Sequence, residues 1–261
     1  MTGAKPVALT IAGSDASGGA GIQADLKVFH QFGVYGEAVV TLVTVQNTCG
    51  VQRVQHLAAD LVADQIRAVI SDIPPAAAKT GALGNGEIIE AVAELAAEFP
   101  FPLIVDPVLV SKNGAALLAA GAVDILKTGL LPRAFLLTPN LEEAGLLTGL
   151  EVRDAAGMRE AARKLSAMGP RAVLVKGGHL SGEAIDILFH NGEWLEFTAP
   201  RIDSRNTHGT GCTFSAAITA SLALGCDLET AVGRAKQYIT NAIRTSPGLG
   251  KGAGPLNHFA G

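Results

Sequence analysis

Two glycines that lie one residue apart, in the stretch 206–212 (Asn-Thr-His-Gly-Thr-Gly-Cys), could form an anion-binding site. Apolar residues follow over 214–222 at the spacing of one helix face, which predicts a glycine loop that enters a helix. The first N–H groups of a helix have no partner inside it and carry a partial positive charge. We therefore expect the backbone of Gly209, Thr210 and Gly211 to bind an anion such as a phosphate. A plain turn that caps a packed helix has the same pattern, and the loop alone does not separate the two.

Cys212 directly follows the second glycine, in the first turn of the predicted helix. A free thiol has a pKa of about 8.5, and a helix N-terminus stabilises the thiolate. We therefore expect a lowered pKa for Cys212 and some thiolate near neutral pH. Such a group can orient or deprotonate a hydroxyl group. The alternative is that Cys212 is a small core residue.

Other polar residues follow the predicted strands one after another along the chain. They are Gly13, Ser14 and Asp15, then Gln46 and Asn47, then Asp106, Asn140, and Lys176 with His179. Ligands of parallel α/β sheets bind beyond the carboxyl ends of the strands. No single one of these residues is specific, but their shared position predicts one cleft.

The hydrophobic pattern predicts the elements that position these residues. Strands are expected over 7–11, 38–45, 76–80, 103–105, 134–138 and 172–175, and helices over 22–30, 57–70, 87–99, 123–131, 141–147, 155–168 and 228–245. Asn191 and Gly192 lie between two β-prone runs, 184–189 and 194–198, and predict a hairpin. The alternation predicts a three-layer α/β/α fold, with a mostly parallel sheet and an antiparallel hairpin at one edge. No linker or repeat divides the chain, so we expect residues 1–261 to form one domain.

Composition restricts the classes of partner. The net charge is -4 and no basic run occurs, so nucleic acid is not an expected partner. The three cysteines lie far apart without a CxxC pair, which indicates neither disulfides nor zinc and favours a reducing cytosol. The longest apolar stretch, 38–45, is too short to span a bilayer, and the first six residues lack the order of a signal peptide. We expect a soluble cytoplasmic protein without a membrane partner.

Two common nucleotide-binding patterns are missing. Gly19 and Gly21 begin a dinucleotide-type pattern, but Ala24 stands where it needs its third glycine, and no Gly-Lys pair precedes Ser or Thr.

Other motifs occur in order: Ala-Gly-Ser-Asp-x-Ser-Gly-Gly-Ala-Gly-Ile-Gln-Ala-Asp over 12–25, Gln-Asn-Thr over 46–48, Thr-Pro-Asn-x-x-Glu over 138–143, Val-Lys-Gly-Gly-His over 175–179, the glycine loop, and Gly-Lys-Gly-x-Gly-Pro over 250–255. In this order the chain, from about residue 7 to about residue 259, resembles bacterial hydroxymethylpyrimidine and phosphomethylpyrimidine kinases of the ribokinase-like superfamily.

The resemblance implies transfer of the ATP γ-phosphoryl group to 4-amino-5-hydroxymethyl-2-methylpyrimidine, and then to its monophosphate, giving the diphosphate used for thiamine. It implies ATP and Mg²⁺ as cofactors, a small-molecule substrate and a homodimer. It places the amides of 209–211 at the transferred phosphoryl group and Cys212 where the wider superfamily has an aspartate base. The remaining phosphate-side assignments that it implies are Asp106 and Glu143 for the metal, and Lys176, Lys236 and Asn140 for ATP.

The pyrimidine site implied by the resemblance contains Gly13, Asp25, Gln46 and Val108. A carboxylate can accept the amino hydrogen of an aminopyrimidine, and an amide can both donate and accept. The loop 110–115 and the hairpin region are the candidates for a lid. Two alternatives stay open: a pyridoxal or pyridoxine kinase on the same fold, and a non-catalytic nucleotide or pyrimidine sensor.

Overall fold

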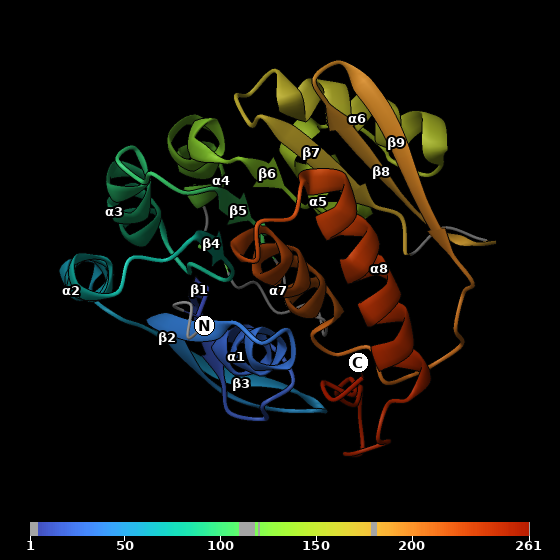
Figure 1. Cartoon of the computed structure of the whole chain (residues 1–261), viewed down its shortest axis with the longest axis horizontal. Helices are drawn as coiled ribbons and strands as arrows, with labels where there is room; N and C mark the ends of the chain where they lie inside the picture. The colour runs from blue at the N-terminus through green and yellow to red at the C-terminus, as the bar shows by residue number, and fades with distance from the viewer. Residues whose placement is uncertain (1–4, 110–117, 120, 179–181, 261) are drawn as a thin grey trace.

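The computed structural model describes residues 5–109, 118–119, 121–178 and 182–260. Within these ranges one nine-stranded sheet has the order β3-β2-β1-β4-β5-β6-β7-β8-β9 (Figure 1). The strands are β1 (Val7–Asp15), β2 (Tyr35–Asn47), β3 (Gly50–His56), β4 (Ala77–Thr80), β5 (Leu103–Val105), β6 (Leu136–Leu137), β7 (Ala172–Lys176), β8 (Ala184–His190) and β9 (Glu193–Ala199). The lid candidate 110–115 and His179 lie outside the described residues.

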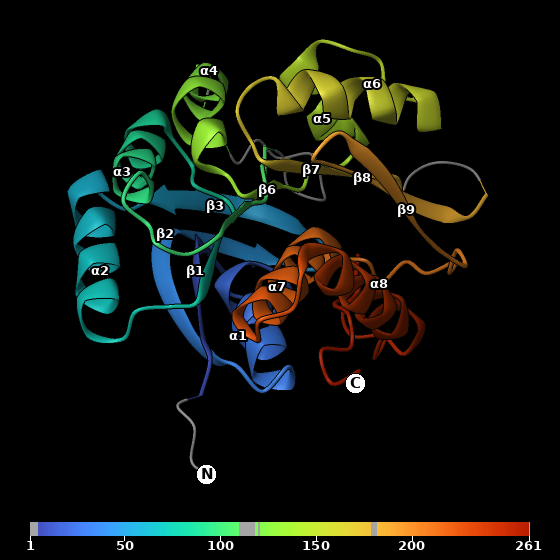
Figure 2. The same cartoon turned by 45° about the horizontal axis from the view of Figure 1, so that its top comes forward.

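Helices cover both faces of the sheet, as the alternation of elements predicts. They are α1 (Gly21–Gln31), α2 (Ala59–Asp72), α3 (Gly86–Ala96), α4 (Ala122–Ile125), α5 (Leu141–Thr148), α6 (Ala155–Ser166), α7 (Thr210–Ala223) and α8 (Leu228–Arg244). Figure 2 shows α1, α7 and α8 on one side of the sheet and α2 to α6 on the other. The three-layer α/β/α arrangement is therefore confirmed.

Each face of the sheet has its own hydrophobic core, because side chains alternate along a strand. On β1, Ala8 belongs to the core under α1, α7 and α8, while Leu9 belongs to the core under the other helices. On β4, Ala77 and Ala78 divide in the same way. The side chain of an odd-numbered β4 residue therefore faces α1 and α7.

The middle of the sheet is parallel and both edges are antiparallel. The strands from β2 to β7 in sheet order pair in parallel, and β8 and β9 form the expected hairpin at one edge. The strand β3, antiparallel to β2 at the other edge, was not expected. Its polar residues Gln52, Arg53 and Gln55 are exposed, so an edge strand here lacks the alternation that marks a half-buried strand.

The segment predicted as one helix over 123–131 is divided in the structure. The four-residue helix α4 passes into a π-helical turn, Leu126–Leu130, and then into a 3₁₀ turn, Leu131–Arg133. A proline at position 132 has no N–H group to continue α-helical bonding, which fits a change of helix type at this point.

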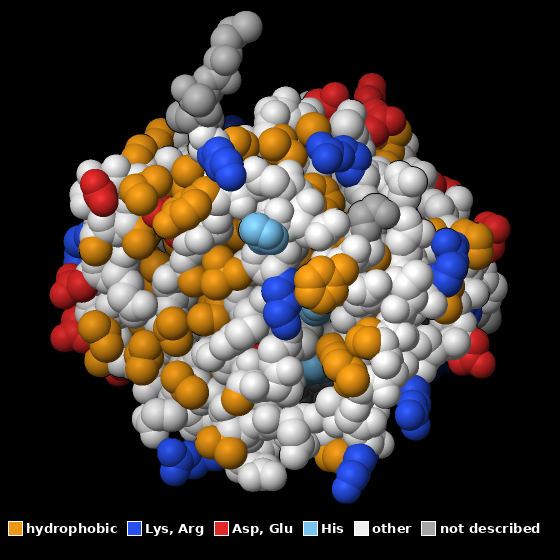
Figure 3. All heavy atoms as spheres, turned by 60° about the horizontal axis from the view of Figure 1, so that its bottom comes forward, with side chains coloured by type: hydrophobic (Ala, Val, Ile, Leu, Met, Phe, Trp, Pro, Cys, Tyr) orange, Lys and Arg blue, Asp and Glu red, His pale blue; other side chains and the backbone are white. Residues whose placement is uncertain are grey.

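The outer surface carries side chains of mixed character. Figure 3 shows one face of the molecule, on which Lys and Arg side chains stand scattered among hydrophobic and polar ones. Among the helices in the described ranges, none is both long enough and apolar enough to cross a membrane.

Replacement of Phe29 by alanine should strongly destabilise the fold. Phe29 is fully buried in the core under α1, α7 and α8, so its removal leaves a cavity that costs about 3–5 kcal/mol in the free energy of unfolding. Urea denaturation of Phe29→Ala measures this cost. The matched control is Phe259→Ala, at a position that is 86% exposed, which should change the free energy by less than about 0.5 kcal/mol. A loss below 1 kcal/mol for Phe29→Ala would contradict the packing described.

Candidate active site

The glycine loop enters α7 as the sequence predicts. Gly209 is the residue before the helix and has a left-handed backbone, with φ of 80°. A Cβ atom at this position would lie 1.8 Å from the Gly19 carbonyl oxygen, so only glycine fits. In the part of the chain that the structure describes, no group accepts a hydrogen bond from the amides of Gly211 and Cys212. These two N–H groups are therefore available to an anion at the start of α7.

Asp15, at the end of β1, joins the glycine loop to the loop that precedes α1. Its Oδ2 accepts hydrogen bonds from the Gly19 and Ala20 amides and lies 2.8 Å from His208 Nε2, while Oδ1 accepts from Ser17. Burial would raise the pKa of Asp15, but the hydrogen bonds from His208 and Ser17 outweigh it and hold the pKa well below its usual range. The carboxylate is thus ionised and fixes the two loops against each other.

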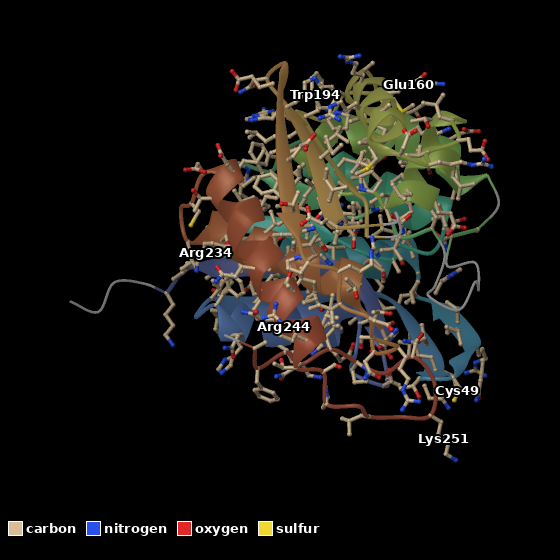
Figure 4. All side chains as sticks on the ribbon, turned by 90° about the vertical axis from the view of Figure 1, so that its right-hand side faces the viewer. Cys49, Glu160, Trp194, Arg234, Arg244 and Lys251 are labelled. Atoms are coloured by element: carbon tan, nitrogen blue, oxygen red, sulfur yellow. The ribbon has the colours of Figure 1, made fainter. Side chains whose placement is uncertain are left out.

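The C-terminal segment 248–258 packs over the same loop. The Gly254 carbonyl accepts a hydrogen bond from the His208 amide, and His258 Nε2 lies 3.1 Å from the hydroxyl of Thr213 on α7. Further along, the Gly252 amide donates to the side chain of Thr48 in the β2–β3 turn. Figure 4 shows Lys251 of this segment and Cys49 of that turn at the same corner of the molecule.

Asp106 and Lys176 form a buried ion pair at the carboxyl ends of β5 and β7. Lys176 Nζ lies 2.9 Å from Asp106 Oδ1, which also accepts a hydrogen bond from Thr138. Asp106 Oδ2 accepts from Ser215 of α7. Burial would raise the pKa of Asp106, but Lys176 and then Lys79 outweigh it and lower the pKa. The pair therefore stays charged and ties two strand ends to α7.

Asn140 and Glu143 form a capping box at the start of α5. The Asn140 side chain accepts from the Glu143 amide at 2.9 Å, and Glu143 Oε2 accepts from the Asn140 amide at 2.8 Å. Burial, opposed by the nearby Lys176, raises the pKa of Glu143 to about 7. A nearby cation would therefore lower the pKa of Glu143 and favour its ionised form.

The start of α7 lies directly beside the ion pair. A Cβ atom at Gly211 would lie 3.4 Å from Lys176 Nζ and 3.6 Å from Asp106 Oδ2. The structure therefore brings the start of α7 together with Asp106 and Lys176. The charges of Asp106 and then Glu143, with a smaller effect of Cys212, raise the pKa of Lys176 against its burial.

The residues expected around a pyrimidine ring lie at the ends of β1 and β2 and after β5. Gly13 lies on β1, where an added Cβ would meet Leu42 at 2.6 Å, and its carbonyl oxygen faces Gly21. Gln46, near the end of β2, helps to lower the pKa of Asp15. Val108 follows β5 and lines a cavity of about 10 Å³, which has room for one water molecule.

Asp25 is fully buried on α1 and does not present an open carboxylate. Its Oδ2 lies 2.8 Å from Lys79 Nζ of β4 and accepts a 2.7 Å hydrogen bond from Thr10 of β1. The other oxygen, Oδ1, is buried and has no hydrogen-bond partner within the described ranges. Burial raises the pKa of Asp25, so its charge depends on Lys79.

Lys236 of α8 is occupied by an internal partner. Its ammonium lies 2.6 Å from Asp186 Oδ2 of β8, and both side chains are largely buried. Asp186 Oδ1 accepts a hydrogen bond from the Gly177 amide, just after β7. Lys236 is thus near the Lys176 turn, but its charge is neutralised by Asp186.

The expected lowering of the Cys212 pKa is wrong for this structure. Burial raises the pKa of the thiol to about 12, although Lys79 and the Gly21 amide act to lower it. The helix N-terminus was correctly placed, but the carboxylates of Asp25 and Asp106 also lie close enough to disfavour the thiolate. At neutral pH the Cys212 side chain is therefore a thiol.

The site offers two carboxylates to a metal ion rather than a complete cage. Across the described segments, no group of three or more His, Cys, Asp or Glu side chains could hold a metal. Mg²⁺ commonly binds through one or two carboxylates, phosphate oxygens and water. Asp106 and Glu143 fit such a site, since Glu143 has an oxygen that no described donor contacts.

Two buried charged residues near the site, Lys79 and Asp15, were given no role by sequence reasoning. Lys79 was not assigned a role, although a lysine inside the short apolar strand 76–80 is an unusual residue that needs a buried partner. Asp15 lay inside a quoted motif without a role of its own. Nothing in the local sequence indicates that its partner is His208, 193 positions away.

Replacement of Glu143 by glutamine should make stability less sensitive to pH. The folded pKa of about 7 lies above the usual 4.5, so the folded state holds the proton more tightly and loses stability as pH rises between these values. Glu143→Gln should therefore gain about 3 kcal/mol relative to the natural chain between pH 4.5 and 7, and no more above pH 7. Urea denaturation in EDTA at several pH values measures the difference. Glu142→Gln, an exposed position in the same turn, is the control, and an equal trend in both variants would refute the assignment.

Comparisons with known proteins identify the group to which this architecture belongs. A family model for phosphomethylpyrimidine kinase matches residues 15–257. The hydroxymethylpyrimidine/phosphomethylpyrimidine kinase of Streptomyces coelicolor is 49% identical over 253 residues, covering 97% of this chain and 94% of that protein. The thiamine biosynthesis bifunctional protein ThiED of Geobacter sulfurreducens is 52% identical over 253 residues and covers 96% of this chain. The chain spans about half of that longer protein, 52%.

Solved structures agree with the sequence comparisons. An ADP complex of Bacillus subtilis pyridoxal kinase has a TM-score of 0.91 at 38% identity, with 98% of each chain covered. Phosphomethylpyrimidine kinase from Clostridium difficile has a TM-score of 0.82 at 44% identity, covering 92% of this chain and 100% of that one. The expected ribokinase-like fold is confirmed by these similarities, and the chain belongs to the phosphomethylpyrimidine kinase family.

Proposed function

We propose that this chain transfers the γ-phosphoryl group of ATP to the hydroxymethyl group of 4-amino-5-hydroxymethyl-2-methylpyrimidine, and a second phosphoryl group to the resulting monophosphate. The observation that carries the proposal is the meeting of the free α7 amides with the Asp106–Lys176 pair and Cys212. Phosphoryl transfer needs mainly positioning and charge neutralisation, which these groups can supply. The curated relatives named for this reaction support the choice of substrate.

The phosphate side is built from the start of α7 and the strand ends. The amides of Gly209, Gly211 and Cys212 donate to the oxygens of the transferred phosphoryl group as its charge spreads in the transition state, whereas the Thr210 amide already donates to the Thr207 carbonyl oxygen. Lys176 neutralises the same charge, and Asp106 holds its ammonium in place. Asn140 positions Glu143 through the capping box at the nucleotide side. Lys236 supports this side indirectly, because it holds Asp186 and thereby the turn after β7.

Asp106 and Glu143 are the proposed magnesium ligands, partly through water. A bound Mg²⁺ would neutralise phosphate charge and orient the transferred group. Lys176 and the α7 amides would lie beside these carboxylates, so that cationic and hydrogen-bonding groups also face the phosphates.

Cys212 is assigned to the substrate hydroxyl. The thiol orients the hydroxyl oxygen toward the phosphorus and, when deprotonated, takes the hydroxyl proton. The bond from the γ-phosphorus to the bridging oxygen of ADP breaks as the new O–P bond forms. Because the transition state is loose, little deprotonation is needed before transfer, which is compatible with a thiol that is neutral at pH 7.

The ring side is assigned to Gly13, Asp25, Gln46 and Val108. Gln46 can rotate from Asp15 to the aminopyrimidine edge, where its amide both donates and accepts. Asp25 contributes through Oδ1, the buried oxygen that has no described partner. The backbone of Gly13 and the side chain of Val108 form apolar walls.

We also propose that residues 1–261 act as one kinase domain, as a homodimer in the cytoplasm, without nucleic-acid or membrane partners. One continuous sheet that contains every described strand supports the single domain. Three free cysteines support a reducing compartment.

Pyridoxal phosphorylation is the second candidate function. The 38% identity and close superposition with Bacillus subtilis pyridoxal kinase favour it. Both substrates carry a hydroxymethyl group on a nitrogen-containing aromatic ring, so the phosphate side would be used in the same way.

Turnover with each substrate separates the candidates. The purified chain is incubated with ATP, Mg²⁺ and hydroxymethylpyrimidine, and in parallel with pyridoxal, while ADP is measured and products are identified by mass spectrometry. We expect the mono- and diphosphate of the pyrimidine. Pyridoxal phosphate alone would overturn the substrate, and no ADP in either reaction would favour a sensor.

Cys212→Ala should reduce kcat by about 10²-fold or more, because it removes the group that orients the hydroxyl. Cys212→Ser keeps an oxygen that can accept the hydroxyl hydrogen bond, so it should lose less. Steady-state kinetics at saturating ATP and circular dichroism of each variant separate a kinetic defect from misfolding. Cys226→Ala is the matched control at a partly buried cysteine remote from the site, and near-normal turnover of Cys212→Ala would refute the role.

A further inference from the structure

The C-terminal segment 248–258 contacts both the β2–β3 turn and the glycine loop before α7. It contains the motif Gly-Lys-Gly-x-Gly-Pro over 250–255, which has no part in the proposed reaction. Both regions belong to the candidate site, because Gln46 near the end of β2 is assigned to the ring and residues 209–212 are assigned to the phosphoryl group. A segment that contacts both regions can connect the two halves of the site.

Thr48 makes the contact on the ring side. The Gly252 amide donates a 3.2 Å hydrogen bond to Thr48 Oγ1. A Cβ atom at Gly252 would lie 2.1 Å from the Thr48 carbonyl oxygen, and a Cβ atom at Gly250 would lie 2.4 Å from the Thr48 side chain. The backbone of the segment therefore lies against the turn at a distance that a side chain would prevent.

The β2–β3 turn is itself fixed to the end of β2. Asn47 is the last residue of β2 and pairs with Gly50 across the hairpin, and its Oδ1 accepts a 2.9 Å hydrogen bond from the Cys49 amide. Thr48 lies two positions after Gln46. A change in the position of Gln46 is therefore passed to Thr48 through a short, hydrogen-bonded stretch of chain.

The same segment contacts the glycine loop through Gly254. The Gly254 carbonyl oxygen accepts a 3.1 Å hydrogen bond from the His208 amide, and His208 forms a parallel bridge with Pro255. A Cβ atom at Gly254 would lie 2.3 Å from Asn206 Oδ1, so this close approach also requires glycine. Because His208 directly precedes Gly209, the segment bears on the residue from which α7 begins.

We propose that Thr48 is a positioning residue whose hydroxyl group couples a ring bound beside Gln46 to the start of α7. The proposal rests on the proposed function for the places of the ring and of the phosphoryl group. A bound ring holds Gln46 and with it the β2–β3 turn. The turn holds Gly252, and Gly254 then holds the glycine loop. The α7 amides are thus held most firmly when the hydroxymethyl-bearing ring is in place.

The size of the coupling is limited, because it passes through one hydrogen bond between neutral groups. Such a bond changes an equilibrium by about 2-fold to 10-fold. Thr48 is half-buried in a turn, so removal of its hydroxyl group leaves the two hydrophobic cores intact. We therefore expect changes of a few-fold in a folded protein.

Limited proteolysis after Lys251 measures the coupling without turnover. Lys251 is exposed (Figure 4), so trypsin can cut there when the segment leaves the turn, and mass spectrometry follows release of the peptide 252–261. Without ATP, saturating hydroxymethylpyrimidine should slow cleavage of the natural chain about threefold or more. Thr48→Val keeps the shape of the side chain but loses the hydroxyl group, so the pyrimidine should no longer protect it. Thr48→Ser keeps the hydroxyl group and should remain protected.

Thr245→Val is the matched control variant. The Thr245 hydroxyl accepts a 3.0 Å hydrogen bond from the Asn257 side chain, so it holds the same segment without contacting the β2–β3 turn. The pyrimidine should therefore protect Thr245→Val as strongly as the natural chain. Gly252→Ala places a methyl group against the Thr48 carbonyl oxygen and should lose the protection, which gives a second test if Thr48→Val does not fold.

Steady-state kinetics separate positioning from direct binding of the ring. Thr48→Val should lower kcat for the pyrimidine about threefold or more, while KM for the pyrimidine stays within about twofold. Thr48→Ser should restore kcat, because the acceptor for the Gly252 amide is present again. A raised KM with an unchanged kcat would make Thr48 a ring-binding residue and would overturn the proposal.

Three results of the proteolysis would also overturn the coupling. They are no protection of a natural chain that does form ADP with the pyrimidine, undiminished protection of Thr48→Val, and loss of protection in Thr48→Ser or in Thr245→Val. A natural chain that forms no ADP with the pyrimidine contradicts the proposed function instead, so the two failures are distinguishable.

Discussion

The approach of two glycine loops is the constraint on which the site depends. Gly209 presses against the Gly19 carbonyl so closely that no side chain fits, and the Asp15 carboxylate holds both loops through His208 and the amides before α1. This contact directs the N-terminus of α7 over the end of β1. The free amides of α7, the ion pair at β5 and β7, and the thiol then fall within one small volume.

Buried lysines and aspartates define the surroundings of that volume. Three pairs, Lys79 with Asp25, Lys176 with Asp106 and Lys236 with Asp186, each join elements distant in sequence. Removing one partner of a buried pair costs about 3–5 kcal/mol, whereas keeping both brings little net stability. The pairs therefore act mainly by fixing where charges stand. Of these three lysines, Lys176 lies beside the α7 amides.

Local patterns in the sequence predicted the order of strands and helices, because buried parallel strands and amphipathic helices have clear periods. The glycine loop and the edge hairpin followed in the same way, whereas the capping box of Asn140 and Glu143 was not predicted. The strand β3 was not predicted, because an exposed polar edge strand lacks such a hydrophobic period. The prediction of a lowered pKa for Cys212 was wrong for another reason. The helix N-terminus is a local property, whereas burial and the closeness of Asp25 and Asp106 arise only when the chain folds.

The ion-pair partners of the buried lysines could not be predicted from the local sequence either. Lys236 has the residue type of a phosphate ligand, yet the structure commits it to Asp186, fifty positions earlier. The family resemblance places such residues near the correct part of the site. Only the contacts in the structure show whether a charged side chain already has a partner.

The C-terminal segment has a consequence for how the protein is made. A growing chain emerges from the ribosome with its N-terminus first. The loop before α1 and the glycine loop are therefore both synthesised before Gly254 and His258, which brace the second loop from outside. A nascent chain can form the whole sheet while this brace is still missing. Support of the glycine loop therefore depends on residues made after every described strand, so a chain truncated before Gly254 would keep these strands but lack the contacts that brace the loop.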